Sequence, residues 1–175
     1  AGPLVERIEI GGETRLLYKA LPIDVAVIRA TYADTQGNCT FQREGVSAET
    51  LAIAQAAKNS GGRVIVQVED VVEYGALDTR LVRLPGIYVD AIVAAAPENH
   101  MQTFGTGYNP AYCGEVRVPV SSLKPLALDR RKVVARRAAM ELVPNAITNL
   151  GIGMPEGVAA VAAEEGLHGM VLTTE

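Results

Sequence analysis

A glycine-containing turn is the first feature of this 175-residue sequence that could do chemistry. The stretch "NLGIGMPEG" places Gly151, Ile152, Gly153 and Met154 directly before Pro155. Glycines let the backbone approach a ligand closely, proline favours the first turn of a helix, and the free N–H groups there attract negative charge. The turn could hold a phosphate or a developing oxyanion. A tight strand-to-helix turn without a ligand is the alternative, since the spacing matches neither G-x-G-x-x-G nor a P-loop.

A carboxylate, Glu175, follows the next apolar stretch, "MVLTT". Residues just past the carboxyl ends of parallel strands line the ligand crevice of an α/β sheet. If "AITNL" and "MVLTT" are neighbouring strands, residues 151–154 and Glu175 emerge at the same edge. A carboxylate in that position can be a nucleophile, a general base or a metal ligand. A solvated glutamate at the end of a strand is the competing interpretation.

Other reactive side chains are poorly placed for catalysis. His100 and His168 have no partner at the spacing of a metal site or a catalytic triad. Ser121 and Ser122 lie in a proline-rich segment without an activating base. We therefore expect no metal site and no serine hydrolysis.

The charged residues of two expected helices favour solvated faces. Five basic residues of the first expected helix could bind phosphates, but we expect them to form a solvent-facing helix surface. They are Arg130, Arg131, Lys132, Arg136 and Arg137. Glu164 and Glu165 stand at the end of a later helix, where negative charge is mildly unfavourable, and we expect them to face solvent.

Composition limits the classes of protein further. The net charge is −4 with acids and bases mixed, which argues against general nucleic-acid binding. Hydrophobic residues make up 49% but form short runs, and the sequence shows neither a membrane span nor a signal peptide. Cys39 and Cys113 have no metal spacing, and free thiols in a reducing cytoplasm are expected. The sequence indicates a globular cytoplasmic protein that does not bind membranes.

The first part of the chain alternates strands with a helix. Strands are expected at 24–30, 63–72 and 86–96, the first of them buried, with a turn carrying Asp34, Gly37 and Asn38 after it. A helix is expected within 47–62, with Ser47 as N-cap, Glu49 in the first turn, Leu51, Ala54 and Ala57 on one face, and two glycines at the end. This order predicts βαβ units and a mostly parallel sheet.

The pattern changes in the second part. Residues 97–128 contain prolines and glycines without a helical period, which indicates a boundary or an ordered crossing segment. A helix capped by Asp129 is then expected over 130–142, with Val134, Ala138 and Leu142 on one face and Ala135 and Ala139 beside them. A strand at 146–150, a helix from Pro155 to Gly166 and a strand at 169–174 complete a second α/β unit.

Several long motifs carry a resemblance to a known family. The stretch "NLGIGMPEGVAAVAAEEG" followed by "LTTE" resembles the start of the β half of class I (family I) coenzyme A transferases. The stretch "YKALPIDVAVIRATYADTQGN" is similar to the α half. The stretches "GGRVIVQVEDVV", "LPGIYVDAIV" and "RRKVVARRAAMEL" resemble the fused branch of acetate or propionate CoA-transferases, which act on short-chain acyl-CoA.

The resemblance implies an organisation. It predicts an α/β fold with mostly parallel sheets, flanking helices and two tandem CoA-transferase-like units, each incomplete in this chain. Residues 1–97 would be the later part of the α half, 98–128 the crossing segment, and 129–175 the start of the β half. The remainder of the site would come from the same polypeptide or a second chain, and a homo-oligomer is expected.

The resemblance also implies a chemistry. Glu175 matches the nucleophile, which would form a glutamyl-CoA thioester in a ping-pong transfer of CoA from an acyl-CoA to a free carboxylic acid. Gly151, Ile152, Gly153 and Met154 would stabilise the oxyanion or hold the thioester. CoA and acyl-CoA would be substrates, without a permanently bound cofactor. An acyl-CoA hydrolase on the same scaffold, or a non-catalytic acyl-CoA-binding or assembly piece, remains an alternative.

Overall fold

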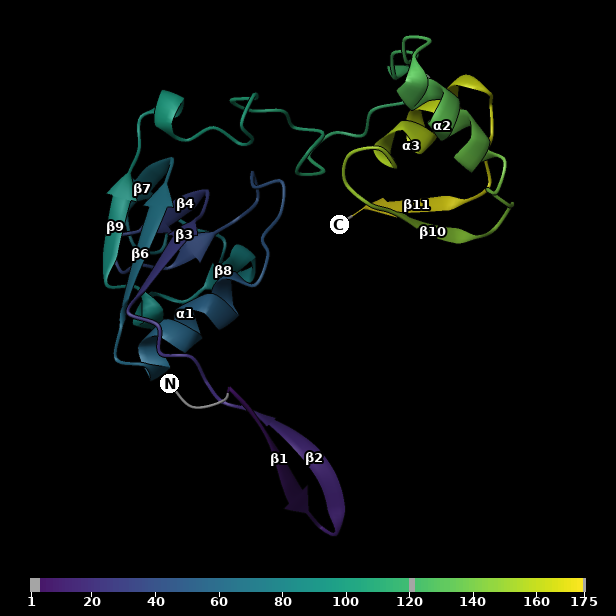
Figure 1. Ribbon diagram of the computed structural model, residues 1–175. Coiled ribbons are helices and arrows are strands. Elements are labelled where there is room, and N and C mark those ends of the chain that lie inside the picture. The colour runs from purple at the N-terminus through teal and green to yellow at the C-terminus, as the bar shows by residue number, and fades with distance from the viewer. Residues whose placement is uncertain (1–3, 120–121, 175) are drawn as a thin grey trace. The chain divides into compact units, whose positions relative to one another are not determined.

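The computed structural model describes residues 4–119 and 122–174 of the chain, which divide into two compact units at Val116 and Arg117 (Figure 1). This division falls inside the segment expected to separate the two halves. Their assignment to an α and a β half stays a prediction.

The first unit contains nine strands, one α-helix and three short 3₁₀ helices among its described residues. The strands are β1 (Val5–Ile10), β2 (Glu13–Tyr18), β3 (Val25–Arg29), β4 (Tyr32–Asp34), β5 (Cys39–Thr40), β6 (Arg63–Val68), β7 (Asp70–Val72), β8 (Val82–Leu84) and β9 (Ala91–Ala94). The helices are α1 (Thr50–Asn59), η1 (Thr79–Leu81), η2 (Gly86–Tyr88) and η3 (Pro97–Asn99).

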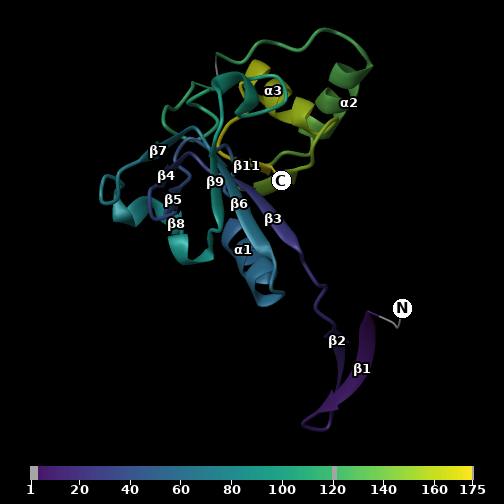
Figure 2. The same ribbon diagram turned by 90° about the vertical axis from the view of Figure 1, so that its left-hand side faces the viewer.

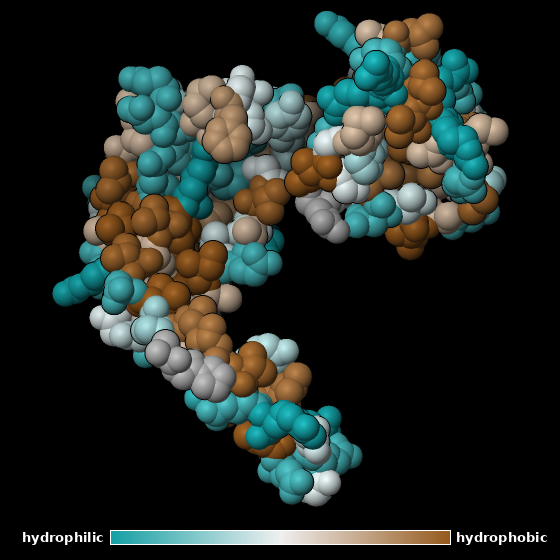
Figure 3. Space-filling model, in the orientation of Figure 1, coloured by the Kyte–Doolittle hydropathy of each residue, from teal (hydrophilic) through white to brown (hydrophobic). Residues whose placement is uncertain are grey.

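A parallel sheet of order β3-β6-β9 forms the centre of the first unit, and α1 packs on β3 and β6 (Figure 2). Ala26 and Ile28 of β3 are buried in the core, while Val25 and Val27, which alternate with them, are exposed. The expectation that the strand at 24–30 is buried therefore holds for the face with Ala26 and Ile28 and is wrong for the opposite face. The cause is that α1 covers a single face of this sheet, and Figure 3 shows hydrophobic residues at the surface of the first unit.

The first unit also contains a second sheet, of order β7-β4-β5-β8. The predicted turn after residue 30 is confirmed at its β4–β5 connection. The Asp34 carboxylate accepts hydrogen bonds from the backbone N–H groups of Gln36 and Asn38, each at 2.9 Å. Gly37 adopts a positive φ of 86°, which completes this tight turn.

The start of α1 differs from the prediction. Glu49, not Ser47, is the N-cap, and its side chain makes no capping hydrogen bond. Ala48 has a φ of +45°, a left-handed conformation that keeps Ser47 out of the helix. Ala54 and Ala57 are buried as expected, whereas Leu51 is exposed.

The end of α1 follows the prediction. The N–H of Gly62 bonds the carbonyl of Ala57 and the N–H of Gly61 bonds that of Lys58, the two bonds of a Schellman motif. Gly62 is also tightly surrounded, because a Cβ there would lie 2.3 Å from the carbonyl oxygen of Ile23. The end of α1 and the return of the chain to the sheet therefore both depend on Gly61 and Gly62.

Two expected strands are shorter in the structure. The run 63–72 divides into β6 and β7, because the N–H of Glu69 bonds the carbonyl of Thr31 and the chain changes sheets there. Within 86–96 only Ala91–Ala94 is a strand, and Gly86–Tyr88 forms η2.

An antiparallel hairpin of β1 and β2 was not predicted. Gly11 and Gly12 both have positive φ, at 59° and 81°, as a two-residue type I′ turn requires. Leu16 and Leu17 of this hairpin are exposed.

The second unit contains α2 (Arg130–Ala139), β10 (Ile147–Leu150), α3 (Glu156–Glu164) and β11 (Val171–Thr174). β10 and β11 are parallel neighbours, as the placement of Glu175 assumed. The α/β class with parallel sheets and flanking helices is confirmed in both units. The two helices pack on each other, with Ala135, Val158 and Val161 in the small core between helices and sheet.

The helix ends of the second unit are close to those expected. Asp129 caps α2, since its carboxylate accepts from the N–H of Lys132 at 3.0 Å. Pro155 is the N-cap of α3 instead of its first residue. The buried face of α2 carries Ala135 and Ala139, whereas Val134, which lies on the neighbouring face, is exposed.

No helix in the described part of the chain is long and apolar enough to cross a membrane.

Candidate functional site

The turn after β10 offers free backbone donors. Among the described residues, the N–H groups of Ile152, Gly153 and Met154 have no hydrogen-bond acceptor. Gly153 adopts a φ of +94°, a conformation that a side chain would strain. Ile152 and Met154 expose their side chains. The predicted turn thus exists, and its N–H groups are available to an anion.

One bond from α2 reaches this turn. Nη2 of Arg131 donates to the carbonyl oxygen of Gly153 at 3.1 Å, across 22 residues of sequence. Arg131 was expected to be a solvated helix residue, and its contact to the turn is not visible in a linear sequence.

The register of β10 and β11 brings the turn to the end of β11. Leu150 pairs with Thr174, and Asn149 with Thr173. The Thr173 hydroxyl donates to Oδ1 of Asn149 at 3.0 Å, so the two strands are also joined by side chains. Glu175, the predicted nucleophile, lies outside the described residues.

The helices behind the turn are joined by ion pairs. Nζ of Lys132 lies 2.6 Å from Oε1 of Glu164 and 3.0 Å from the carbonyl oxygen of Leu126. Nε of Arg136 lies 2.8 Å from Oε1 of Glu165. Glu164 and Glu165 are exposed, as expected, but each also pairs with a basic residue of α2, because α3 packs its end against α2.

A buried polar cluster lies at the carboxyl ends of β3 and β6 in the first unit. Arg29 pairs with Glu44, Nε to Oε2 at 2.7 Å, and donates to the carbonyl oxygens of His100 and Met101. Burial, and then the nearby Arg29 cation, lower the pKa of His100. The cluster ties the loop after β5 to the loop after β9.

The tautomer of His100 follows from its partner. Nε2 of Gln67 donates to the carbonyl oxygen of Asn99 at 2.9 Å and lies 3.0 Å from Nδ1 of His100. The bond to Asn99 orients the amide, so Nδ1 is an acceptor and the proton sits on Nε2. That Nε2 lies 3.8 Å from Oε1 of Glu44, and neither buried atom makes a hydrogen bond of ordinary geometry among the described residues.

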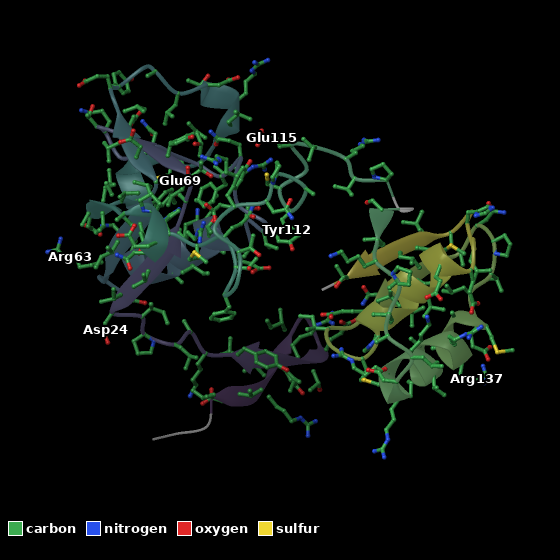
Figure 4. All side chains as sticks on the ribbon, turned by 90° about the horizontal axis from the view of Figure 1, so that it is seen from above. Asp24, Arg63, Glu69, Tyr112, Glu115 and Arg137 are labelled. Atoms are coloured by element: carbon green, nitrogen blue, oxygen red, sulfur yellow. The ribbon has the colours of Figure 1, made fainter. Side chains whose placement is uncertain are left out.

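A cavity of about 470 Å³ lies beside this cluster. Arg43 lines it, with Nη1 2.6 Å from Oε2 of Glu69 and the guanidinium carbon 3.9 Å from the centre of the Tyr108 ring. A hydrogen bond to Glu115, and then one to Cys113, raise the pKa of Tyr108 to about 12. Figure 4 labels Glu69 and Glu115 among the polar side chains of this unit.

Sequence reasoning missed this second polar region. His100 was dismissed because no partner stands near it in sequence, yet Glu44 and Gln67 reach it from other loops and strands. The available signal was an arginine and a glutamine at the ends of two apolar strands. In residues 4–119 and 122–174, no group of three or more His, Cys, Asp or Glu side chains could hold a metal ion.

Comparison with known proteins gives the family. A model described as "Coenzyme A transferase" matches residues 2–95. The chain therefore belongs to the coenzyme A transferase family.

Two curated relatives match almost the whole chain. Caffeate CoA-transferase of Acetobacterium woodii is 49% identical over 98% of the chain, and acetate CoA-transferase YdiF of Escherichia coli K12 is 38% identical over 98%. The matches cover 33% and 32% of these proteins, so the chain spans about a third of the length of the curated relatives it matches.

A solved structure has the same fold. The acyl-CoA transferase YdiF of Escherichia coli O157:H7, in a thioester complex with CoA, is 36% identical with a TM-score of 0.83. That match covers 100% of this chain and 33% of YdiF. The expected fold is thus confirmed by an independent structure.

Proposed function

We propose that the protein containing this chain transfers CoA from a short-chain acyl-CoA to a free carboxylic acid, with Glu175 as nucleophile. The single observation that carries the proposal is the parallel pairing of Leu150 with Thr174. Because of this pairing, the N–H groups of residues 152–154, which have no acceptor among the described residues, and the residue after Thr174 in the sequence follow adjacent strands at the same end. The membership in the CoA-transferase family supports the same chemistry.

The reaction divides into two halves. The Glu175 carboxylate attacks the thioester carbonyl, CoA leaves as thiolate, and an acyl-glutamyl anhydride forms. The thiolate then attacks the glutamyl carbonyl and expels the free carboxylate, which leaves a glutamyl-CoA thioester. An incoming carboxylate reverses both steps and departs as the new acyl-CoA, so the kinetics are ping-pong.

The turn has a defined task in this scheme. Each attack passes through a tetrahedral oxyanion, which preorganised N–H donors stabilise. The turn of Gly151, Ile152, Gly153 and Met154 supplies such donors, either to the oxyanion or to the bound thioester. YdiF was solved as a thioester complex with CoA, which supports a covalent route for the present protein.

The wider expectations belong to the same proposal. CoA enters as a substrate without a permanently bound cofactor or metal, and the acyl partners are small carboxylic acids. Residues 1–97 and 129–175 contribute to the α and β halves, and the rest of the site comes from the same polypeptide or a second chain. The enzyme is a cytoplasmic homo-oligomer that binds neither nucleic acid nor membrane.

Mass spectrometry of the complete protein after incubation with acetyl-CoA tests the proposal. We expect a CoA adduct on Glu175, which borohydride removes by reduction of the thioester. Glu175→Asp should abolish the adduct, because it withdraws the carboxylate by about one methylene from its attack position. Glu165→Asp is the matched control and should retain it, since Glu165 pairs with Arg136 at the far end of α3.

The acceptor distinguishes the alternatives. A transferase consumes acetyl-CoA beyond one equivalent per active site only when a second carboxylate such as propionate is present, whereas a hydrolase turns it over in water alone. Unmodified Glu175 in the folded, complete protein would refute the nucleophile and leave a binding or assembly role.

A further inference from the structure

We propose that Arg131 is a positioning residue, which fixes the direction of the Met154 N–H in the turn after β10. The inference deepens the proposed function, because it assigns a support to the donors that would face the oxyanion. It starts from the bond between Nη2 of Arg131 and the carbonyl oxygen of Gly153, 3.1 Å long.

The geometry of the peptide unit carries the argument. Every described peptide bond is trans, and in a trans peptide the C=O of one residue and the N–H of the next point in opposite directions in one plane. A donor held on the oxygen of Gly153 therefore aims the N–H of Met154 away from Arg131. This N–H is one of those without an acceptor among the described residues.

Among the described residues, no other hydrogen bond is recorded to the Gly153 carbonyl or the Met154 N–H. Gly153 has a φ of +94°, and a Cβ built on it would meet no atom within 4 Å. Glycine rotates freely about its backbone, so packing does not hold the unit. Met154 is 42% exposed, so packing holds its side chain only in part.

Arg131 itself sits on a firm support. It occupies the first turn of α2, where Asp129 caps the helix and Lys132 is anchored to Glu164 on α3. A guanidinium is always protonated and presents a rigid set of donors. Its charge also polarises the Gly153 carbonyl, which strengthens the N–H on the other side of the same peptide.

Kinetics of the complete protein test the inference. Arg131→Ala should lower kcat by about 10- to 100-fold, because the donor is misaimed in the transition state, with little change in KM. Arg137→Ala is the matched control. It removes an arginine of the same helix (Figure 4) that pairs only with the exposed Glu141, four residues on, among the described residues, and it should leave kcat unchanged.

Guanidinium rescue and one further variant separate positioning from folding. Millimolar guanidinium should restore part of the kcat of Arg131→Ala and none in Arg137→Ala. Arg131→Lys keeps the charge and one donor and should fall between wild type and Arg131→Ala. Equal activity of the Arg131→Ala and Arg137→Ala variants, or a loss confined to KM, would overturn the inference.

The amide nitrogen chemical shift of Met154, in protein labelled selectively at methionine, gives a readout independent of turnover. It should move in Arg131→Ala and not in Arg137→Ala, and an unchanged shift refutes the positioning role. A wild-type protein without CoA transfer would refute the proposed function instead, while the Met154 shift would still decide whether Arg131 orients this peptide.

Discussion

Lys132 and Glu164 are joined across the helix pair of the second unit, with Nζ 2.6 Å from Oε1. Only 10% of the Lys132 side chain is exposed, and its ammonium also donates to the carbonyl oxygen of Leu126. The beginning of α2 and the end of α3 are thereby held in register. Arg131, one residue earlier, can reach the turn before α3 because this register is fixed.

Replacing Glu164 by Gln should therefore destabilise the protein. The buried ammonium loses its charged partner, and the free energy of unfolding should fall by about 1–3 kcal/mol. Glu165→Gln is the matched control, because its arginine partner is 56% exposed and such surface pairs contribute less than about 1 kcal/mol. Denaturant titration followed by circular dichroism measures both variants, and equal losses would contradict the assigned role of Lys132.

Gly153→Ala should separate backbone strain from catalysis. Gly153 and Gly169 both have positive φ, and a Cβ at either position would meet no atom within 4 Å. Alanine in this conformation costs about 1–2 kcal/mol through strain alone, so both variants should lose similar stability. Only Gly153→Ala should also lose CoA transfer, because its turn carries the free N–H groups. Thermal melts measure the stability of both variants, and initial rates measure their CoA transfer. Equal transfer rates of the two variants would argue against the turn as the oxyanion site.

The sequence predicted the parts of the fold that depend on local patterns. The strand–helix–strand order, the glycine end of α1 and the Asp129 cap follow from residues adjacent in sequence. The β1–β2 hairpin was missed although Gly11 and Gly12 mark its turn, since the flanking residues were not read as alternating strands.

The remaining errors concern contacts between distant residues. The break at Glu69 depends on the carbonyl of Thr31 and cannot be seen in the apolar run that contains it. The burial of Lys132 depends on Glu164, 32 residues away. For the site, the glycine turn was predicted, whereas the bond from Arg131 to Gly153 needed the packing of α2 on α3.

The two cysteines should differ sharply in reactivity. Both are free thiols, as expected, but Cys39 is fully buried and Cys113 is half-buried. Burial, and then the negative charge of Asp34, raise the pKa of Cys39 to about 12, so its reactive thiolate is scarce at neutral pH. Iodoacetamide at mildly alkaline pH should label Cys113 in the native protein and Cys39 only after denaturation. Peptide mass spectrometry distinguishes the sites, with Cys113→Ser as control, and rapid native labelling of Cys39 would contradict its burial.

The stability of the protein should fall as His100 is forced to take a proton. Burial, followed by the charge of Arg29, lowers its pKa in the folded state, while Glu44 and Glu69 oppose this shift only in part. The unfolded chain therefore binds more protons below about pH 6.5, the ordinary pKa of histidine. The contribution of neutral His100 to the free energy of unfolding is fully present above that pH. It is lost as the pH falls toward the lower pKa of His100 in the folded state.

His100→Asn should weaken the dependence of the protein's stability on pH. Asparagine retains an acceptor for Gln67 but does not titrate, so the variant should lose less stability than wild type between about pH 7.5 and 5. His168→Asn, at an exposed position, is the control and should keep the wild-type slope. Denaturation midpoints at several pH values provide the test, and parallel slopes for wild type and His100→Asn would show that His100 does not carry the effect.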